Sequence, residues 1–303
     1  MSFNYDFVKH RNLYFIISVL LTIVGIFFLL TAGLKLGIDF ESGSRVNIQA
    51  NETLTNEQVM ADFEELGFED ATVVLAGEDN KQANVSFKGV LSKNEIAKLN
   101  TYFKEKYGET PSISTVTPTV GRELAQNALF AVLIASLGII IYVAFRFEWS
   151  MAVAAVTALL HDAFMIIAIF SMFRIEVDLP FIAAVLTIVG YSINDTIVTF
   201  DRIRENMKLE KVKTQEKLAE IVNRSIHETL GRSINTVLTV IIAAVALLIF
   251  GADSIRNFSI ALLIGLAFGA YSSIFIASQL WYVMKSRQMK SKKTRPVEAE
   301  PEI

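Results

Sequence analysis

Long apolar runs separated by shorter polar segments dominate the chain. Six of these runs approach or exceed the ~20 residues that an α-helix needs to cross a bilayer. They lie at residues 13–34, 124–145, 150–173, 181–200, 234–250 and 258–284. The first run is too long and too uniformly apolar for the core of a signal peptide, so we interpret it as a retained helix. The pattern therefore predicts an α-helical polytopic membrane protein with six transmembrane helices.

The polar segment 35–122, between the first two runs, has the length of a small domain and carries more acidic than basic residues. Two capping-box patterns, one from Thr55 to Gln58 and one from Ser92 to Glu95, each predict the start of a helix. Strands are predicted at residues 44–50, 71–76, 83–87 and 112–120, and helices at 55–66 and 92–107. The order βαββαβ predicts an α+β ferredoxin-like domain, although a spacer or packing module would also explain the segment.

Basic residues are unevenly distributed between the two sides that alternating helices define. One side carries Lys9, Arg11, Arg146 and the clusters within 201–232 and 285–295, whereas the short links of the other side carry only Arg174 and Arg256. Because Lys and Arg accumulate on the cytoplasmic side, both termini are predicted to be cytoplasmic and the acidic domain extracytoplasmic.

These boundaries predict five parts in chain order. They are a cytoplasmic N-terminus (1–12), the first transmembrane helix (13–34), the extracytoplasmic domain (35–122), transmembrane helices 2–6 (123–284) with a cytoplasmic loop at 201–232, and a basic, then acidic, cytoplasmic tail (285–303).

An acidic side chain lies inside the fourth apolar run. Asp195 is well in from either end of this run, and a charge at the centre of a bilayer costs at least about 2.5–3.5 kcal/mol. Ser192 and Thr199 share its helical face, because they are three and four residues away, and Asn194 precedes it. An ionisable residue at this depth is a candidate for an ion pathway, although a static ion pair between helices would also explain it.

A second polar stripe opens the fifth run. Arg232, Asn235 and Thr236 lie on one helical face by the same spacing. Both stripes lie in the same half of the membrane, so we predict a contact between Asp195 and Arg232, direct or through water.

The third run holds a histidine and an aspartate at adjacent positions, His161 and Asp162. Adjacent residues point in different directions on a helix, so the two are predicted not to pair with each other. One is expected to face the bundle interior and the other to find a serine, threonine or backbone partner. Asp162 joins Asp195 and Arg232 as a candidate for ion coupling, and His161 is a candidate supporting residue.

Small residues mark a predicted site of close helix packing in the sixth run. Gly265 and Gly269 form a GxxxG pattern, followed by Ser272 and Ser273. Glycines at this spacing let two helix backbones approach each other closely.

Composition agrees with a membrane protein and narrows the chemistry. Of the 303 residues, 52% are apolar and 19% charged, whereas a soluble domain has about 45–50% and about 25%. The chain has no cysteine, which excludes thiol catalysis and disulfides. The HExxH, Walker A, GxSxG and GxGxxG patterns are also absent. We therefore expect a chain that is not an enzyme and that has no metal or organic cofactor.

Several segments together resemble the SecF family, the smaller membrane subunit of the bacterial SecDF translocation factor in the resistance–nodulation–division superfamily. The segments are GIDFESG at 37–43, VGREL at 120–124, ALLHD at 158–162, GYSINDTIVTFDRIREN at 190–206, RSINT at 232–236 and FG at 250–251. They extend over nearly the whole chain. The motif residues Gly37, Asp39, Phe40 and Gly43 come directly after the first run, where the family usually has two glycines and this chain has Ser42 and Gly43.

The resemblance implies a factor that uses the proton or sodium gradient to help preproteins through the SecYEG channel. It implies half of a twelve-helix bundle completed by a separate SecD chain, with YajC as a further candidate partner, in the bacterial cell membrane. It also implies that Asp195 is the protonating carboxylate and Arg232 its charge partner, with Asp162, Asn194 and Thr236 in the same motifs. Two alternatives remain, an exporter of small molecules or lipids from the same superfamily and a passive scaffold of the secretion channel.

Overall fold

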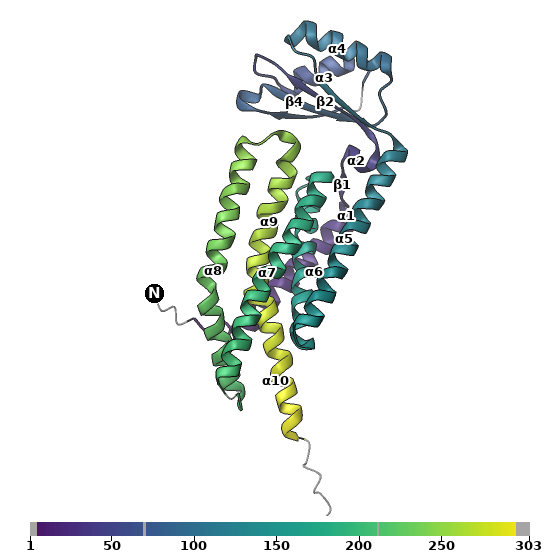
Figure 1. Cartoon of the computed structure of the whole chain (residues 1–303). Helices are drawn as coiled ribbons and strands as arrows, with labels where there is room; N and C mark the ends of the chain where they lie inside the picture. Colours follow the sequence, from purple (N-terminus) through teal and green to yellow (C-terminus); the bar gives the residue numbers. More distant parts are fainter. Residues whose placement is uncertain (1–4, 69–70, 211, 295–303) are drawn as a thin grey trace, which may run out of the picture.

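The structure, a computed structural model, describes residues 5–68, 71–210 and 212–294 (Figure 1). Within these residues, six helices are long and apolar enough to cross a membrane, as predicted. They are α1 (Arg11–Thr31), α5 (Pro118–Arg146), α6 (Trp149–Met172), α7 (Leu179–Leu209), α8 (Gln215–Phe250) and a last helix formed by α9 (Arg256–Ser272), η3 (Ser273–Ala277) and α10 (Ser278–Thr294). Residues 1–4 of the predicted N-terminus and 295–303 of the predicted tail lie outside the described residues.

The predicted cytoplasmic loop 201–232 is largely helical, which differs from the sequence interpretation. Helix α7 continues to Leu209 and α8 begins at Gln215, so the link between them is short. The Thr214 side chain caps α8 by accepting from the backbone N–H of Lys217 at 3.2 Å. Ion pairs between the two extensions, such as Arg202 with Glu228 at 2.6 Å, hold them together. The two helices thus extend beyond the apolar runs that predicted them.

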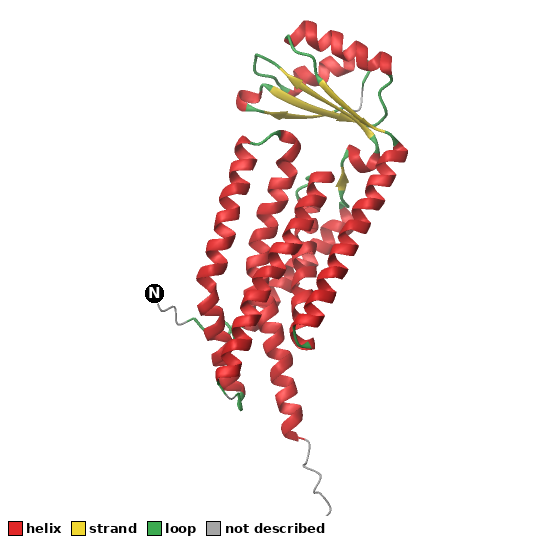
Figure 2. Cartoon of the chain, viewed as in Figure 1, coloured by secondary structure: helices red, strands yellow, loops and turns green. Residues whose placement is uncertain are grey.

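The predicted ferredoxin-like domain is confirmed, and we call it the sheet domain (residues 43–116). It consists of β2 (Gly43–Gln49), α3 (Asn56–Glu65), β3 (Thr72–Ala76), β4 (Gln82–Phe87), α4 (Lys93–Tyr107) and β5 (Ser112–Val116). The four strands are antiparallel in the order β3-β4-β2-β5. Helices α3 and α4 cover one face of this sheet (Figure 2), where Phe63 and Phe103 are fully buried.

Both predicted helix starts in the sheet domain are correct. Thr55 accepts from the N–H of Gln58 at 3.2 Å, and Ser92 and Glu95 form a complete capping box. The last strand is shorter than predicted, because it ends at Val116. Thr117 caps α5, which begins at Pro118, a residue whose fixed φ favours the first position of a helix.

Two short elements attach the sheet domain to the membrane bundle. Strand β1 (Lys35–Leu36) pairs in parallel with β6 (Glu176–Val177), which lies in the link between α6 and α7. Helix α2 (Ile38–Glu41) then packs against α5, where a Cβ on Gly121 would lie 3.4 Å from the backbone of Asp39. The base of the sheet domain is thus tied to three membrane helices.

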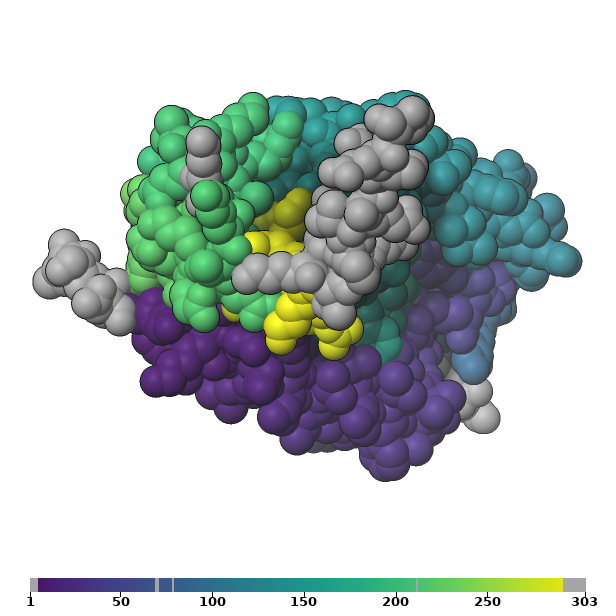
Figure 3. All heavy atoms as spheres, turned by 90° about the horizontal axis from the view of Figure 1, so that it is seen from below, coloured from purple at the N-terminus to yellow at the C-terminus, as the bar shows by residue number. Residues whose placement is uncertain are grey.

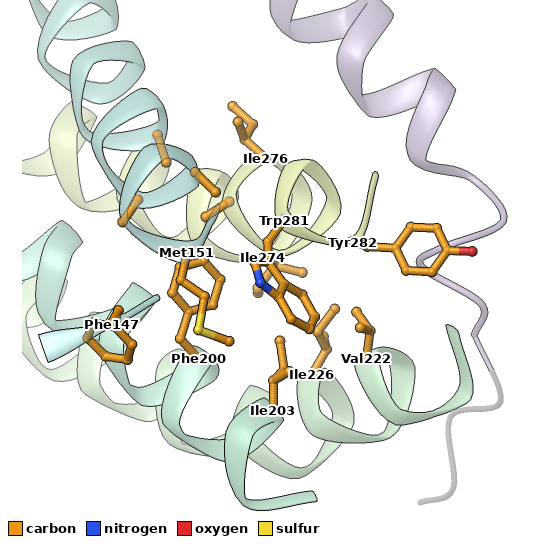
Figure 4. Close-up of a cluster of buried hydrophobic side chains, with 14 of the residues drawn as sticks. Phe147, Met151, Phe200, Ile203, Val222, Ile226, Ile274, Ile276, Trp281 and Tyr282 are labelled. Carbon is orange, nitrogen blue, oxygen red and sulfur yellow. The ribbon is translucent and has the colours of Figure 1, made fainter. Parts of the chain in front are cut away.

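The last helix runs through the middle of the bundle, and seen from below it lies between α1 and the α7–α8 pair (Figure 3). A large apolar cluster surrounds it near the end remote from the sheet domain (Figure 4). Trp281 is fully buried there against Phe200 of α7, with their ring centroids 6.5 Å apart. By contrast, α5 and α8 bury little of their apolar surface within the chain.

Candidate functional site

Helices α7 and α9 approach each other closely at Gly265 and Gly269, where the GxxxG pattern predicts close helix packing. A Cβ added to Gly265 would lie 2.4 Å from Cγ1 of Ile188, and one added to Gly269 would lie 3.3 Å from Cβ of Ser192. Only residues without a side chain allow this spacing. As a result, the hydroxyl groups of α7 come within hydrogen-bonding reach of α6 and α9.

Asp162 occupies the centre of this junction and is completely buried. Its Oδ2 accepts hydrogen bonds from Ser192 Oγ at 2.5 Å and from Ser272 Oγ at 2.6 Å. These two bonds come from α7 and α9, so the carboxylate joins three helices. Asp162 is therefore the residue of the pair that faces the interior, and it also takes the serine partners that were expected for the other residue.

The prediction that His161 and Asp162 do not pair is wrong. His161 Nδ1 lies 3.2 Å from Asp162 Oδ1. The helix fixes the directions of the two Cβ atoms, but the imidazole nitrogen lies beyond two further rotatable bonds and can turn toward its neighbour. His161 Nε2 is buried and has no hydrogen-bond partner among the described residues.

Asp195 has a different environment from Asp162. Its Oδ1 accepts a hydrogen bond from Ser233 Oγ on α8, whereas its Oδ2 is buried and lacks a partner among the described residues. The predicted direct contact with Arg232 is not present in the described part of the chain, and the next residue, Ser233, takes its place. Sequence spacing could not indicate Ser233, because it does not show which of two adjacent positions the rotation of α8 turns toward α7.

Asp195 and Arg232 nevertheless border one cavity of about 100 Å³. Its lining comes from α7, α8 and α9 and includes the predicted residues Ser192, Asn194, Asp195, Arg232 and Thr236, together with Tyr191, Val198, Val237, Gly265, Leu266, Gly269 and Ala270. The cavity is thus where the structure brings most of the predicted polar residues together.

Of the predicted polar residues, four lie outside this cavity lining, namely His161, Asp162, Thr199 and Asn235. Thr199 is buried, and its Oγ1 has no partner in the described residues. Asn235 is exposed on the surface of α8. Four hydroxyl side chains that complete the site were not predicted as site residues from the sequence, namely Thr196, Ser233, Ser272 and Ser273. Thr196 and Ser273 bond to each other at 2.9 Å, and Thr196 follows Ser192 by one helical turn, a spacing that predicts the same face.

The predicted sixth span contains a π-helical segment, η3, which the sequence analysis also missed. Its wider turn leaves backbone carbonyls for side chains to satisfy. Ser278 Oγ donates to the carbonyl of Ser273 at 2.8 Å, and Gln279 Nε2 donates to that of Ile274 at 3.3 Å. Short π-helical segments inside α-helices are frequent at functional sites.

The glycine-rich motif after the first span has a structural role at the base of the sheet domain. A Cβ on Gly37 would lie 2.7 Å from Glu176 Oε1, and one on Gly43 would lie 2.6 Å from the carbonyl of Phe87. Asp39 Oδ2 accepts from the N–H of Leu179 at 3.1 Å, and Phe40 packs against an apolar cluster of the bundle.

Ser42 replaces the first glycine of the expected pair and has a positive φ of 66°. A residue with a Cβ is disfavoured in such a conformation, which is common only for glycine. The backbone geometry that two glycines would provide is therefore retained, with strain at Ser42.

Within the described residues, no three His, Asp or Glu side chains are arranged to hold a metal ion. The buried Asp162 and the half-buried Asp195 instead lie among hydroxyl groups. Such groups both donate and accept hydrogen bonds, so the site can bind and pass protons.

Comparison with known protein families identifies the family of this chain. Residues 96–287 match the family described as "Protein export membrane protein SecD/SecF, C-terminal", and residues 27–53 match "SecD/SecF GG Motif". The chain belongs to the SecD/SecF family. It is 58% identical over 94% of its length to "Protein translocase subunit SecDF" of Bacillus subtilis. It is also 42% identical over 99% of its length to "Protein translocase subunit SecF" of Alicyclobacillus acidocaldarius.

The chain is similar in structure to SecDF proteins as well. It matches the crystal structure of SecDF, a translocon-associated membrane protein from Thermus thermophilus, with a TM-score of 0.83, 35% identity and 93% of the chain covered. The match covers 39% of that SecDF chain, and the chain likewise spans 39% of the Bacillus relative, but it spans 99% of the Alicyclobacillus relative. The chain is therefore a multi-pass membrane protein of the protein translocase family.

Proposed function

We propose that the chain is the SecF-type half of an ion-driven SecDF factor, which uses the proton (or sodium) gradient to assist preprotein translocation through the SecYEG channel. The observation that carries this proposal is the environment of Asp195. This carboxylate lies among the membrane-spanning helices, with one oxygen bonded to Ser233 and the other buried without a partner among the residues that the structure describes. The family membership supports the translocation role.

Asp195 is better suited to bind and release an ion than Asp162. Asp162 has three neighbouring groups that can donate to it, so its charged form is well solvated by the protein. The second oxygen of Asp195 has no such donor, and an anionic oxygen without a donor is costly away from bulk water. A proton or a sodium ion entering the cavity would remove that cost.

Arg232 supplies a positive charge whose attraction to Asp195 depends on whether Asp195 is ionised. Both side chains border the cavity between α7 and α8. When Asp195 is ionised, Arg232 is attracted toward α7, and when Asp195 is neutral this attraction is lost. The ion therefore changes how strongly α8 is held against α7.

Movement of α7 has a direct route to the sheet domain. About 16 residues, or roughly 24 Å of helix, separate Asp195 from the N-terminus of α7. There the N–H of Leu179 donates to Asp39 at 3.1 Å, and Glu176 pairs with Arg45 of β2 at 2.6 Å. A shift of α7 along its axis would thus act on the base of the sheet.

The available energy matches such a shift. One elementary charge crossing the membrane potential supplies about 2.3 kcal/mol per 100 mV. Two-state conformational equilibria differ by a few kcal/mol. One ion per cycle is therefore enough to change which of two arrangements is favoured.

The surface of α8 supports a partner bundle. Arg232 and Asn235 are exposed on a helix that buries little of its apolar segment within the chain, and polar side chains facing lipid are costly. We assign this face to a SecD-type half. SecYEG, YajC and preproteins are the further proposed partners, and the basic residues near both ends support a cytoplasmic location for the termini.

The test is translocation of a reporter preprotein by membrane vesicles that contain the complete complex, with the ion gradient present and collapsed. Asp195→Asn keeps the size and polarity of the side chain but cannot change its charge. We expect this variant to lose the stimulation by the gradient while it retains normal folding and complex assembly. Full stimulation by Asp195→Asn would contradict the proposal.

The matched control is Asp201→Asn on the same helix. Asp201 is partly exposed and pairs with Arg146 and Arg204 beyond the apolar run. Its replacement should leave the stimulation unchanged. Selective collapse of the proton or the sodium gradient then identifies the coupling ion.

A further inference from the structure

Asp162 and His161 form a buried polar pair that the proposed cycle at Asp195 does not use. The side chains are 1% and 10% exposed, so neither has free access to bulk solvent. A histidine and a carboxylate in contact offer two groups that can each hold one proton. Structural packing alone does not require a titratable pair at this place, because an apolar pair of similar size would fill it.

The environment of His161 leaves it free to accept a proton. Its Nδ1 is 3.2 Å from Asp162, and its Nε2 is buried without a partner among the described residues. The nearest aromatic rings are those of Phe268 and Tyr271, with centroids 6.1 and 6.3 Å away. When the ring is neutral with its proton on Nδ1, Nε2 is an unused basic nitrogen.

Ser192 connects this pair to the cavity of Asp195. Its hydroxyl donates to Asp162 at 2.5 Å, and the same residue borders the cavity that Asp195 lines. A polar cavity of about 100 Å³ exceeds the ~10–15 Å³ that a water molecule needs. Hydroxyl groups and water can therefore form a continuous path between the two carboxylates.

A second set of hydroxyl groups runs parallel to this path on α9 and η3. Ser272 donates to Asp162 at 2.6 Å, and the adjacent Ser273 bonds to Thr196 at 2.9 Å. Ser272 and Ser273 also share the carbonyl of Gly269 as an acceptor. The start of the π-helical segment thus lies between the surroundings of the two acids.

We infer that Asp162 and His161 form a second proton-binding site, which exchanges protons with Asp195 through the hydroxyl group of Ser192. This inference rests on the proposed function, because it assigns a further step to the same ion pathway. In that step, Ser192 passes its hydroxyl proton to Asp162 Oδ2 and receives a proton from the cavity side. One proton moves from protonated Asp195 to Asp162, the number of protons stays constant, and the negative charge moves to Asp195.

The charged and titratable groups around this pair are few, so its pH response can be assigned. Tyr271 faces it from α9, and its hydroxyl group bonds to Ser18 and to the carbonyl of Tyr14 on α1. On the side of α7 and α8, the cavity holds Tyr191, Asp195 and Arg232. Among side chains, the imidazole is the type whose unperturbed pKa lies between about pH 5 and 8, so a substitution of His161 is the variant that probes the pH response of the pair.

The experiment measures gradient-stimulated translocation of the reporter preprotein by vesicles with the full complex, across about pH 5 to 8. We expect His161→Gln to change the shape of the pH profile, since glutamine can still donate to Asp162 but cannot titrate. We expect Ser192→Ala to lower the stimulation about tenfold, because a donor to a carboxylate is lost. Ser192→Thr should restore it by returning the hydroxyl group.

The matched control is Ser259→Ala, which removes another fully buried serine hydroxyl, one that bonds only to the carbonyl of Ile255. It should leave both stimulation and pH profile unchanged. If Ser192→Ala does not accumulate in membranes, the pH profile of His161→Gln decides the question alone. An unchanged profile in His161→Gln, or full stimulation in Ser192→Ala, overturns the second site.

Failure of this inference can be told apart from failure of the proposed function. If Asp195→Asn keeps full stimulation, the ion pathway itself is wrong. If Asp195→Asn loses stimulation while His161→Gln and Ser192→Ala both behave like the unmodified chain, only the second proton-binding site is wrong.

Discussion

Two carboxylates, the buried Asp62 of the sheet domain and the half-buried Asp195 of the membrane bundle, have opposite surroundings. Asp62 on α3 is 3% exposed and accepts hydrogen bonds from Tyr107 at 2.7 Å, from Tyr102 at 3.1 Å and from Lys106. Asp195 has one hydroxyl donor, and its second oxygen is buried without a partner in the described part of the chain. Both acids thus have carboxylate oxygens removed from solvent, and the number of donors separates a structural clasp from a group able to change its charge.

The hydrogen bonds to Asp62 also hold its partners in fixed charge states. Burial, then the hydrogen bond to Asp62, raises the pKa of Tyr107. Burial alone would lower the pKa of Lys106, but its bond to Asp62 outweighs this and raises it. Every group around Asp62 thus keeps the charge state it has at neutral pH, which suits a fixed link between α3 and α4.

The two acids are expected to differ most in how much each contributes to the stability of the sheet domain. Asp62→Ala should reduce the stability of the sheet domain by about 2–3 kcal/mol, because Lys106 and Tyr107 lose their partner; partial exposure of Lys106 keeps this below the usual 3–5 kcal/mol. Hydrogen exchange of α3 and α4 in the full-length chain measures the loss. Asp195→Ala should leave that exchange unchanged. Equal protection of α3 in both variants would contradict a structural role for Asp62.

Within the bundle, the α7–α9 packing that surrounds Asp195 can be tested next. Gly265→Ala places a methyl group 2.4 Å from Ile188, and overpacking of this kind costs about 1–3 kcal/mol. The thermal unfolding temperature of the solubilised protein should fall accordingly. Gly190→Ala on α7 is the matched control, since no atom lies within 4 Å of the added Cβ; similar losses in both variants would show that α7 and α9 are not closely packed.

The junction between the two regions contains the strained residue. Ser42→Gly should stabilise the chain by about 0.5–1 kcal/mol, because relief of the left-handed conformation exceeds the entropy cost of an added glycine. Ser44→Gly, two residues further on, should instead destabilise it, since the Ser44 hydroxyl donates to the carbonyl of Gly89 at 2.8 Å. Denaturation of both variants, measured side by side, gives the sign of each change in stability. A loss of stability in Ser42→Gly would show that Ser42 is not strained.

The smallest expected effect is on the pH dependence of stability, and it comes from a third acid, Glu148, in the link between α5 and α6. Burial raises its pKa, but hydrogen bonds from Lys285 and Trp281 outweigh burial and hold the pKa below the ordinary value of 4.5. Its contribution to stability is therefore complete above about pH 4.5 and is lost as the pH falls through its lowered pKa. Hydrogen exchange of α10 should rise slightly on acidification, and Lys285→Met should weaken this dependence.

Much of the fold follows from local sequence patterns, but much of the site does not. Six apolar runs predict six helices, and Thr55 and Ser92 predict their helix starts, because both depend on residues close in the chain. The same reasoning could have ended the last strand before Pro118. It could not show that Ser233 rather than Arg232 bonds Asp195, or that His161 turns toward Asp162. Those contacts depend on side-chain rotamers and on helix rotation, which only the packed bundle determines.

The π-helical segment makes the last helix sensitive to length rather than to side-chain identity. Its extra residue rotates everything beyond Ala277 by about 100° relative to an uninterrupted α-helix. Removing one residue between 273 and 277 would produce a more regular helix, yet it would turn Trp281 out of its apolar surroundings. Insertions and deletions should therefore be rarer in this stretch than substitutions, and any that occur are expected in compensating pairs.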